Sequence, residues 1–169
     1  ARDRYESLWA NGEVPFHWGC HYSTMGSVVY YLVRIEPYTT WARKLHGRGG
    51  QLDIADRLFR SVQATWEGVT SGNMADVKEL VPEMYLVPEL LTNENHVDLG
   101  VQQDGTVVGD VALPPWAKGC PVRFTQIMRK ALEGEHVSAH LHEWIDLVFG
   151  ACQQGPMAEA ALNVFHPLT

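Results

Sequence analysis

The sequence predicts a mainly α-helical, multihelical domain with much irregular, extended chain in its core and at most one small hairpin. Two features support this prediction. Apolar residues recur at helical spacing in short segments that prolines and glycines separate. Residues 77–91 are rich in large apolar side chains, yet Pro82 and Pro88 prevent a long helix there. Because buried backbone must find hydrogen-bond partners, this segment predicts a core in which polar side chains satisfy irregular chain.

The first part of the chain is predicted to form three helices. Ser23 or Thr24 can cap a helix over about 25–33, which Pro37 stops. Thr39 or Thr40 can cap a second helix, which ends near Gly47. A third helix is predicted from Asp53 onward, with one buried stripe, because apolar residues follow at four-residue steps. These residues are Ile54, Leu58, Val62 and Trp66.

A basic cluster, Arg43-Lys44-Leu45-His46-Gly47-Arg48, closes the second predicted helix. Cations at this position favour the helix dipole, and Gly47 suits the turn that ends a helix. The same cations could contact anionic lipid head groups, at about 1 kcal/mol for each cation. The sequence favours the helix-end interpretation and leaves peripheral membrane association open.

Beyond the middle segment, Asp104-Gly105 between Val101 and Val107 predicts a hairpin turn, and 113–116 predicts an extended connector anchored by its tryptophan. Three further helices follow. The first begins at Pro121, the second carries an apolar stripe and ends at Gly150, and the third runs from Pro156 to about Asn163. The stripe of the second helix consists of Val137, Leu141, Trp144, Ile145 and Val148.

Composition limits the classes of function. The chain has 169 residues, of which 46% are hydrophobic and 20% charged, which fits one globular domain. Its net charge of −7 argues against nucleic-acid binding, which requires a basic face. Its three cysteines form no CxxC pair, so we expect reduced thiols in a cytoplasmic protein rather than disulfides or a zinc knuckle.

The helix before Gly150 contains the group of residues that most suggests catalysis. A metal-dependent hydrolase that uses His140, His142 and Asp146 is the alternative function to consider. However, His140 and His142 are two residues apart, so their side chains are separated by about 200° around the helix axis. The zinc-protease pattern HExxH is also incomplete, because position 146 is Asp. Serine-hydrolase, phosphate-loop and dinucleotide-binding motifs are absent from the sequence. We therefore predict no catalytic, metal or cofactor residues.

A structural role explains these polar residues better. Trp144 and Ile145 are predicted to bury one face of the helix, while its polar side chains form hydrogen bonds to loops that cross it. The same reasoning extends to polar residues near Pro37 and near the end of the chain. The candidates for structural hydrogen bonding or a partner groove are Arg34, Glu36, His140, His142, Glu143, Asp146, Asn163 and His166.

An ordered series of motifs along nearly the whole chain resembles the BEACH domain family. The motifs are His21-Tyr-Ser23, YLVRIEPYTT from Tyr31 to Thr40, Asp56-Arg-Leu-Phe59, DVKELVPE from Asp76 to Glu83, LPPWAK from Leu113 to Lys118, Ala131-Leu-Glu133, LHEWIDLVFG from Leu141 to Gly150 and NVFHPLT from Asn163 to Thr169.

The resemblance implies a mainly helical domain with an unusually irregular core and no catalytic activity or cofactor. BEACH domains follow a PH-like domain and precede WD40 repeats in very large cytosolic scaffold proteins of vesicle trafficking and membrane dynamics. We therefore expect residues 1–169 to be a partial BEACH domain, with its upstream part and extreme C-terminal end absent from this sequence. The implied partners are proteins, including a PH-like domain and WD40 repeats of the same full-length chain, and the implied location is cytoplasmic or peripheral on vesicles.

Overall fold

The computed structural model describes residues 1–46, 50–72 and 77–169. The chain divides into two compact units. Unit 1 consists of Ala1–Tyr22, Glu67–Lys78 and Ala131–Thr169, and unit 2 consists of Ser23–Trp66 and Glu79–Lys130.

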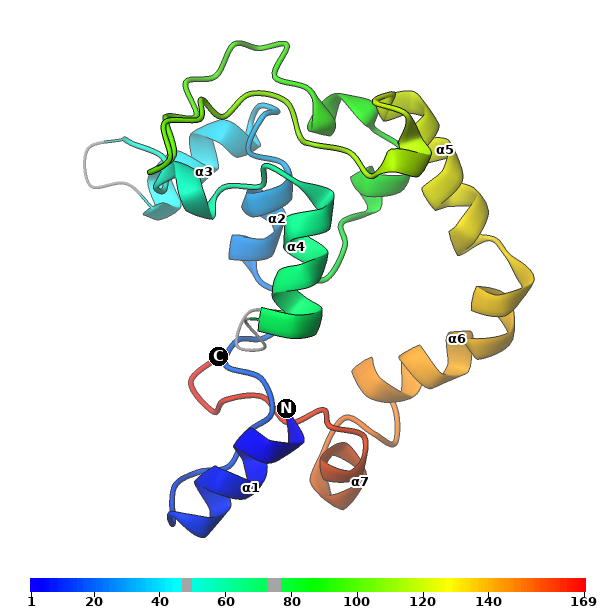
Figure 1. Ribbon diagram of the computed structural model, residues 1–169. Helices are drawn as coiled ribbons and strands as arrows, with labels where there is room; N and C mark the ends of the chain where they lie inside the picture. The colour runs from blue at the N-terminus through cyan, green and yellow to red at the C-terminus, as the bar shows by residue number, and fades with distance from the viewer. Residues whose placement is uncertain (47–49, 73–76) are drawn as a thin grey trace. The chain divides into compact units, whose positions relative to one another are not determined.

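The mainly helical fold predicted from the sequence is confirmed (Figure 1). The described residues contain no β-strand, and their extended segments meet only at isolated bridges. The α-helices are α1 (Arg2–Ala10), α2 (Met25–Tyr31), α3 (Tyr38–His46), α4 (Val62–Glu67), α5 (Pro121–Leu132), α6 (Glu135–Val148) and α7 (Gly155–Ala160). Short 3₁₀ turns are η1 (Ala55–Arg57), η3 (Pro82–Tyr85), η4 (Pro88–Leu91) and η5 (Pro115–Ala117), and η2 (Gly68–Gly72) is a π-helical turn.

Two of the helices predicted in the first part of the chain are present in unit 2, and they pack against each other (Figure 1). The Thr24 side chain accepts a hydrogen bond from the Ser27 backbone N–H at 3.3 Å and so caps α2. The helix ends at Tyr31, two residues earlier than predicted. The expected role of Gly47 in ending α3, and Arg48 of the basic cluster, lie outside the described residues.

The prediction of a single helix from Asp53 to Trp66 is wrong. The segment forms η1, an extended stretch and then α4. The reason is tertiary pairing. Arg60 accepts a hydrogen bond from the Ala112 N–H at 2.8 Å, and Ala112 in turn accepts one from the Val62 N–H at 3.1 Å, which holds this backbone extended. The predicted stripe is consequently split, with Leu58 buried while Trp66 is 68% exposed.

The prediction of a core built partly from irregular chain is confirmed in unit 2. Pro82 and Pro88 each begin a 3₁₀ turn rather than interrupt a helix. These turns bury Met84, Leu90 and Leu91. The same core cluster includes Tyr31, Leu32, Phe59, Val81, Val111, Ala117 and Phe124.

The hairpin and the connector are also in unit 2. Val101 and Val107 form one antiparallel bridge around a turn in which Gly105 has a φ of +88°, so the predicted small hairpin is confirmed. The connector is less extended than predicted, because η5 forms within it. Trp116 of η5 stacks on Phe124 of α5, with ring centroids 5.2 Å apart.

Unit 1 has very little core. Among its described side chains only His17 and Ala158 are buried. Its first helix, α1, was not predicted, and it buries no residue. Extended backbone links the two ends of the chain, where the His17 and Trp18 N–H groups both donate to the Val164 carbonyl, at 2.8 and 3.1 Å. The last helix, α7, ends at Ala160, before the predicted boundary at Asn163.

Candidate functional site

Arg34 lies at the centre of the irregular interior of unit 2 and is fully buried. Its Nε and Nη2 atoms both donate to the Gly109 carbonyl, at 2.9 and 2.8 Å. The Arg34 carbonyl accepts a hydrogen bond from the Asn95 side chain at 2.9 Å. Through its guanidinium and its own carbonyl, Arg34 therefore joins three segments of chain that lie outside helices and strands.

Burial lowers the pKa of Arg34 to about 10, and the nearby Asp110 carboxylate opposes this shift. The side chain therefore remains charged at neutral pH. Within the described residues, its Nη1 atom is buried without a hydrogen-bond partner. Among the described residues, the cation is held by the dipole of the Gly109 carbonyl rather than by a direct ion pair.

Glu36 stands at the N-terminus of α3. Its carboxylate accepts hydrogen bonds from the Thr40 backbone N–H at 3.2 Å and from the Thr40 hydroxyl at 3.1 Å. Nearby, the buried Thr39 hydroxyl donates to the Val33 carbonyl at 2.7 Å. The Glu36 and Thr39 side chains thus provide hydrogen-bond partners for backbone groups on either side of Pro37, where the preceding helix cannot continue.

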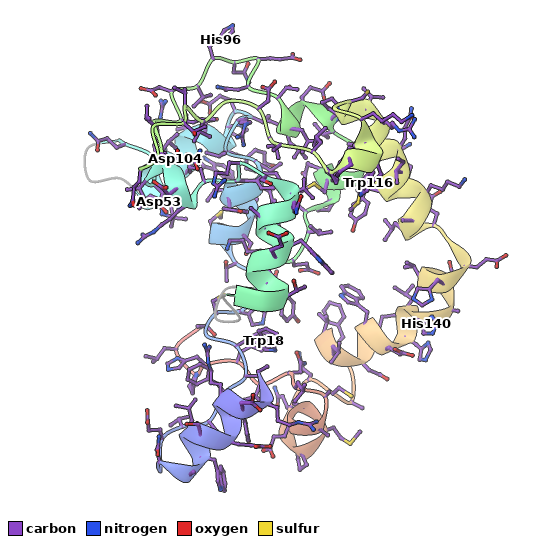
Figure 2. All side chains as sticks on the ribbon, in the orientation of Figure 1. Trp18, Asp53, His96, Asp104, Trp116 and His140 are labelled. Carbon is purple, nitrogen blue, oxygen red and sulfur yellow. The ribbon has the colours of Figure 1, made fainter. Side chains whose placement is uncertain are left out.

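The four polar candidates in the C-terminal helix all lie on α6, and the structure does not bring them together. His140 Nδ1 lies 2.7 Å from the His136 carbonyl, so its hydrogen bond is within its own helix rather than to a crossing loop (Figure 2). His142 and Glu143 are exposed. Asp146 is half-buried, and its backbone carbonyl accepts the Cys152 N–H at 2.9 Å.

The predicted burial of one face of this helix is wrong for the part of the chain that the structure describes. None of the residues of α6 is buried. The apolar stripe is present, but Leu141, Trp144 and Ile145 are 42–47% exposed, and the following Phe149 is 74% exposed. The helix ends at Val148, two residues before the predicted stop at Gly150, where a Cβ would lie 2.8 Å from the Asp146 Cα.

The two candidates near the end of the chain contact different parts of unit 1. The Asn163 amide donates to the Leu147 carbonyl at 2.8 Å and to the Cys152 carbonyl at 2.9 Å, and so joins the end of α6 to the turn that follows. The His166 ring packs edge-on against Phe16, with centroids 4.8 Å apart, and its Nδ1 accepts the Leu168 N–H at 3.1 Å.

Sequence reasoning missed a buried histidine in unit 1. His17 is 2% exposed and stacks on Tyr5, with ring centroids 4.4 Å apart. Burial lowers the pKa of His17, and the N-terminal amine adds to the effect. Burial and the neighbouring Glu159 carboxylate raise the pKa of Tyr5. No motif marks this group, because its members come from opposite ends of the chain.

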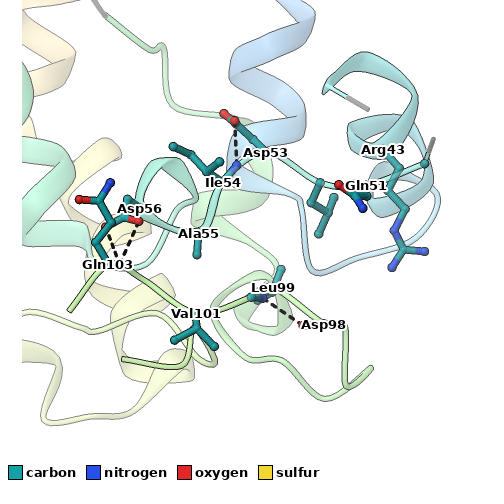
Figure 3. Close-up of a pocket in the computed structure, with 13 residues that line it drawn as sticks. Arg43, Gln51, Asp53, Ile54, Ala55, Asp56, Asp98, Leu99, Val101 and Gln103 are labelled. Atoms are coloured by element: carbon teal, nitrogen blue, oxygen red, sulfur yellow. Dashed lines mark hydrogen bonds between the residues drawn. The ribbon is translucent and has the colours of Figure 1, made fainter. Parts of the chain in front are cut away.

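A cavity of about 640 Å³ lies in unit 2, away from all of the predicted candidates (Figure 3). Three aspartates line it, and each accepts a hydrogen bond from nearby backbone. Asp53 accepts from Ile54 at 2.8 Å, Asp98 from Gly100 at 3.1 Å, and Asp56 from Gln103 at 3.2 Å. These carboxylates order the two loops that form the walls, and the lining pairs no nucleophile with a base.

Metal and membrane sites can be assessed over residues 1–46, 50–72 and 77–169. Within them, no three His, Cys, Asp or Glu side chains converge as metal ligands, so His140, His142 and Asp146 do not form a metal centre. In the same residues, no helix is both long and apolar enough to cross a bilayer.

The fold and the polar contacts define a helical domain in which buried polar groups stabilise irregular backbone. The chain belongs to the Beige/BEACH domain family, whose model matches residues 1–169. It is 52% identical over 168 residues to BEACH domain-containing protein B of Arabidopsis thaliana and 54% identical over 154 residues to WD repeat- and FYVE domain-containing protein 4 of Homo sapiens. It is also 48% identical over 171 residues to Beige protein homolog 1 of Schizosaccharomyces pombe.

These matches cover 99%, 91% and 99% of the chain, in the same order. They cover only 6%, 5% and 6% of the three relatives. The chain therefore corresponds to a small part of very long proteins.

Proposed function

We propose that the chain is a non-enzymatic protein-interaction module of a large cytoplasmic scaffold protein that acts in vesicle trafficking and membrane dynamics. The observation that supports this best is the BEACH family match over the whole chain, to relatives many times its length. One relative is described by its name as containing WD repeats and a FYVE domain, which is consistent with a module that works among other domains.

The apolar face of α6 is the surface that we propose for protein contact. Large apolar residues at positions 141, 144, 145 and 149 follow helical spacing and are 42–74% exposed. An amphipathic helix normally buries such a stripe, and recognition of an exposed one by another protein surface uses anchors at this spacing. Unit 1 has only two buried side chains among those described, so covering this face would add to a small core.

The proposed partners are other domains of the same full-length chain, a PH-like domain and WD40 repeats, with peripheral membrane association through these domains. A second protein that binds the α6 face would lower the exposure of Trp144, which is now 45% exposed. Because the chain has six tryptophans, the part of the fluorescence change that a Trp144→Phe variant lacks reports the contact.

Binding of a purified PH-like domain from the full-length protein tests the proposal. Leu141→Glu places a charge in the centre of the α6 stripe, and we expect it to weaken binding about tenfold or more, since an unpaired charge would be buried at the interface. Ala139→Glu is the matched control, because position 139 is exposed and lies about 200° around the helix from Leu141. Equal affinity of the wild-type chain and the Leu141→Glu variant would contradict this surface. Turnover of a substrate by the isolated chain would contradict the non-enzymatic function.

A further inference from the structure

Two exposed histidines meet on the first turns of α6. His136 and His140 are four residues apart, and their ring centroids are 4.4 Å apart with an angle of 36° between the ring planes. Residues four apart on a helix lie on the same face, which is the spacing at which two side chains can share one ion. His142, two residues beyond His140, points to the other side of the helix.

The hydrogen bond of His140 determines which ring nitrogen is free. Its Nδ1 atom lies 2.7 Å from the His136 carbonyl oxygen. A carbonyl oxygen can only accept, so Nδ1 carries the proton and the neutral ring has its lone pair on Nε2. Histidines that bind metals commonly donate their other N–H to a backbone carbonyl in this way, because the bond fixes the tautomer and the ring orientation.

We propose that His136 and His140 chelate a Zn²⁺ ion, with Nε2 of His140 as one ligand and a ring nitrogen of His136 as the other. Zinc–nitrogen bonds of 2.0–2.1 Å in tetrahedral geometry require the two nitrogens to lie about 3.4 Å apart. The two rings are neighbours, with centroids 4.4 Å apart, and the proposal requires the His136 side chain to rotate until its nitrogen reaches this separation. Imidazole nitrogen is a ligand that suits zinc.

The site has two protein ligands. Across the described residues, no third His, Cys, Asp or Glu joins the pair as a ligand, so water fills the remaining positions. The site is therefore open, and a side chain of a bound partner could replace a water. Its expected effect on this chain is local: the ion joins two successive turns of α6 and stabilises the helix by mass action.

Zinc titration of the 169-residue chain by isothermal calorimetry tests the site, with the same measurement on variants. His136→Ala removes a ligand and leaves the backbone carbonyl that orients His140. We expect it to weaken zinc binding at least about tenfold, since even the loss of an outer-shell partner costs that much. His140→Ala should have the same effect, and His142→Ala, the exposed control on the same helix, should bind zinc as the wild-type chain does.

The double variant His136→Ala/His140→Ala distinguishes chelation from two separate weak sites. If the rings share one ion, either single change removes most of the binding, and the double variant should be little weaker than each single variant. Losses that add would show two independent ligands and overturn the proposal. Wild-type affinity in His136→Ala, or an equal loss in His142→Ala, would also overturn it. Circular dichroism of each variant verifies that α6 is still formed.

Discussion

The interior of unit 2 and helix α6 of unit 1 use polar side chains in opposite ways, although the sequence predicts one role for both. Arg34 is fully buried and donates to a carbonyl 75 residues away in sequence. His140 is exposed, and its hydrogen bond reaches only the preceding turn of its own helix. A polar side chain can satisfy irregular backbone only where packing surrounds it with such backbone. Unit 2 provides that packing, and the described part of α6 does not.

Replacing Arg34 is the strongest test of this difference. Arg34→Met keeps a long side chain but removes both donors to the buried Gly109 carbonyl. Hydrogen bonds that involve a charged group contribute about 1.5–3 kcal/mol, so we expect a loss of about 3 kcal/mol in the free energy of unfolding. Urea denaturation measures this value. Unchanged stability would mean that Gly109 finds another donor, and the contrast with α6 would then fail.

Replacing Asn163 tests whether a side chain in unit 1 stabilises irregular backbone by hydrogen bonding, as Arg34 does in unit 2. Its amide joins the Leu147 and Cys152 carbonyls, so Asn163→Ala leaves two acceptors without this donor. Because the residue is only half-buried, water can replace part of the loss, and we expect about 1–2 kcal/mol of destabilisation. Asn163→Asp, a matched control of the same size, also removes the donors and should cost at least as much. If neither change alters the free energy of unfolding, then stabilising hydrogen bonds from side chains to irregular backbone are limited to unit 2.

The fold class was predictable because short-range signals determine it. Caps, prolines and glycines located α2, α3, α5 and α6 within a few residues. The prediction of a helix from Asp53 failed because the apolar spacing suits a helix, yet hydrogen bonds with Ala112 hold residues 60 and 61 extended before α4 begins at Val62. That partner lies about fifty residues away, and no local pattern identifies it.

The site was less predictable than the fold, for a related reason. Periodicity identified the apolar stripe of α6, but it could not show whether other chain covers the stripe. The His17 cluster depends on the pairing of 17–18 with residue 164, which only the folded chain creates. The His136–His140 pair could have been predicted, because a spacing of four residues on a predicted helix is visible in the sequence.

The protonation of His17 gives a smaller, pH-dependent effect in unit 1. Its Nδ1 accepts the Val164 N–H at 3.2 Å, which requires the neutral ring. Because burial lowers the pKa of His17 in the folded chain, the unfolded chain binds the proton more readily. The contribution of neutral His17 to the free energy of unfolding is therefore complete above the ordinary histidine pKa of 6.5, and it is lost as the pH falls from there through the lower pKa of the folded chain.

We expect His17→Gln to reduce the acid sensitivity of the chain, since glutamine can accept the same N–H but doesn't titrate. The difference between its unfolding free energies at pH 7 and pH 5 should be smaller than in the wild-type chain by about 1 kcal/mol, the contribution of one hydrogen bond. Equal pH dependence of the two proteins would show that His17 binds its proton equally well in the folded and the unfolded chain, and that burial does not lower its pKa. The other histidines are present in both chains and cancel in the comparison.

The smallest expected effect is at His142 on α6. This side chain is exposed, and among the described residues it makes no hydrogen bond or ring contact. His142→Ala should therefore change the free energy of unfolding by less than about 0.5 kcal/mol, as exposed substitutions usually do. A loss near that of Arg34→Met would mean that α6 is covered by chain that reaches His142, and the two regions would then use their polar side chains alike. Weaker binding to a PH-like domain with unchanged stability would instead place His142 in the partner surface, next to the stripe that contains Leu141.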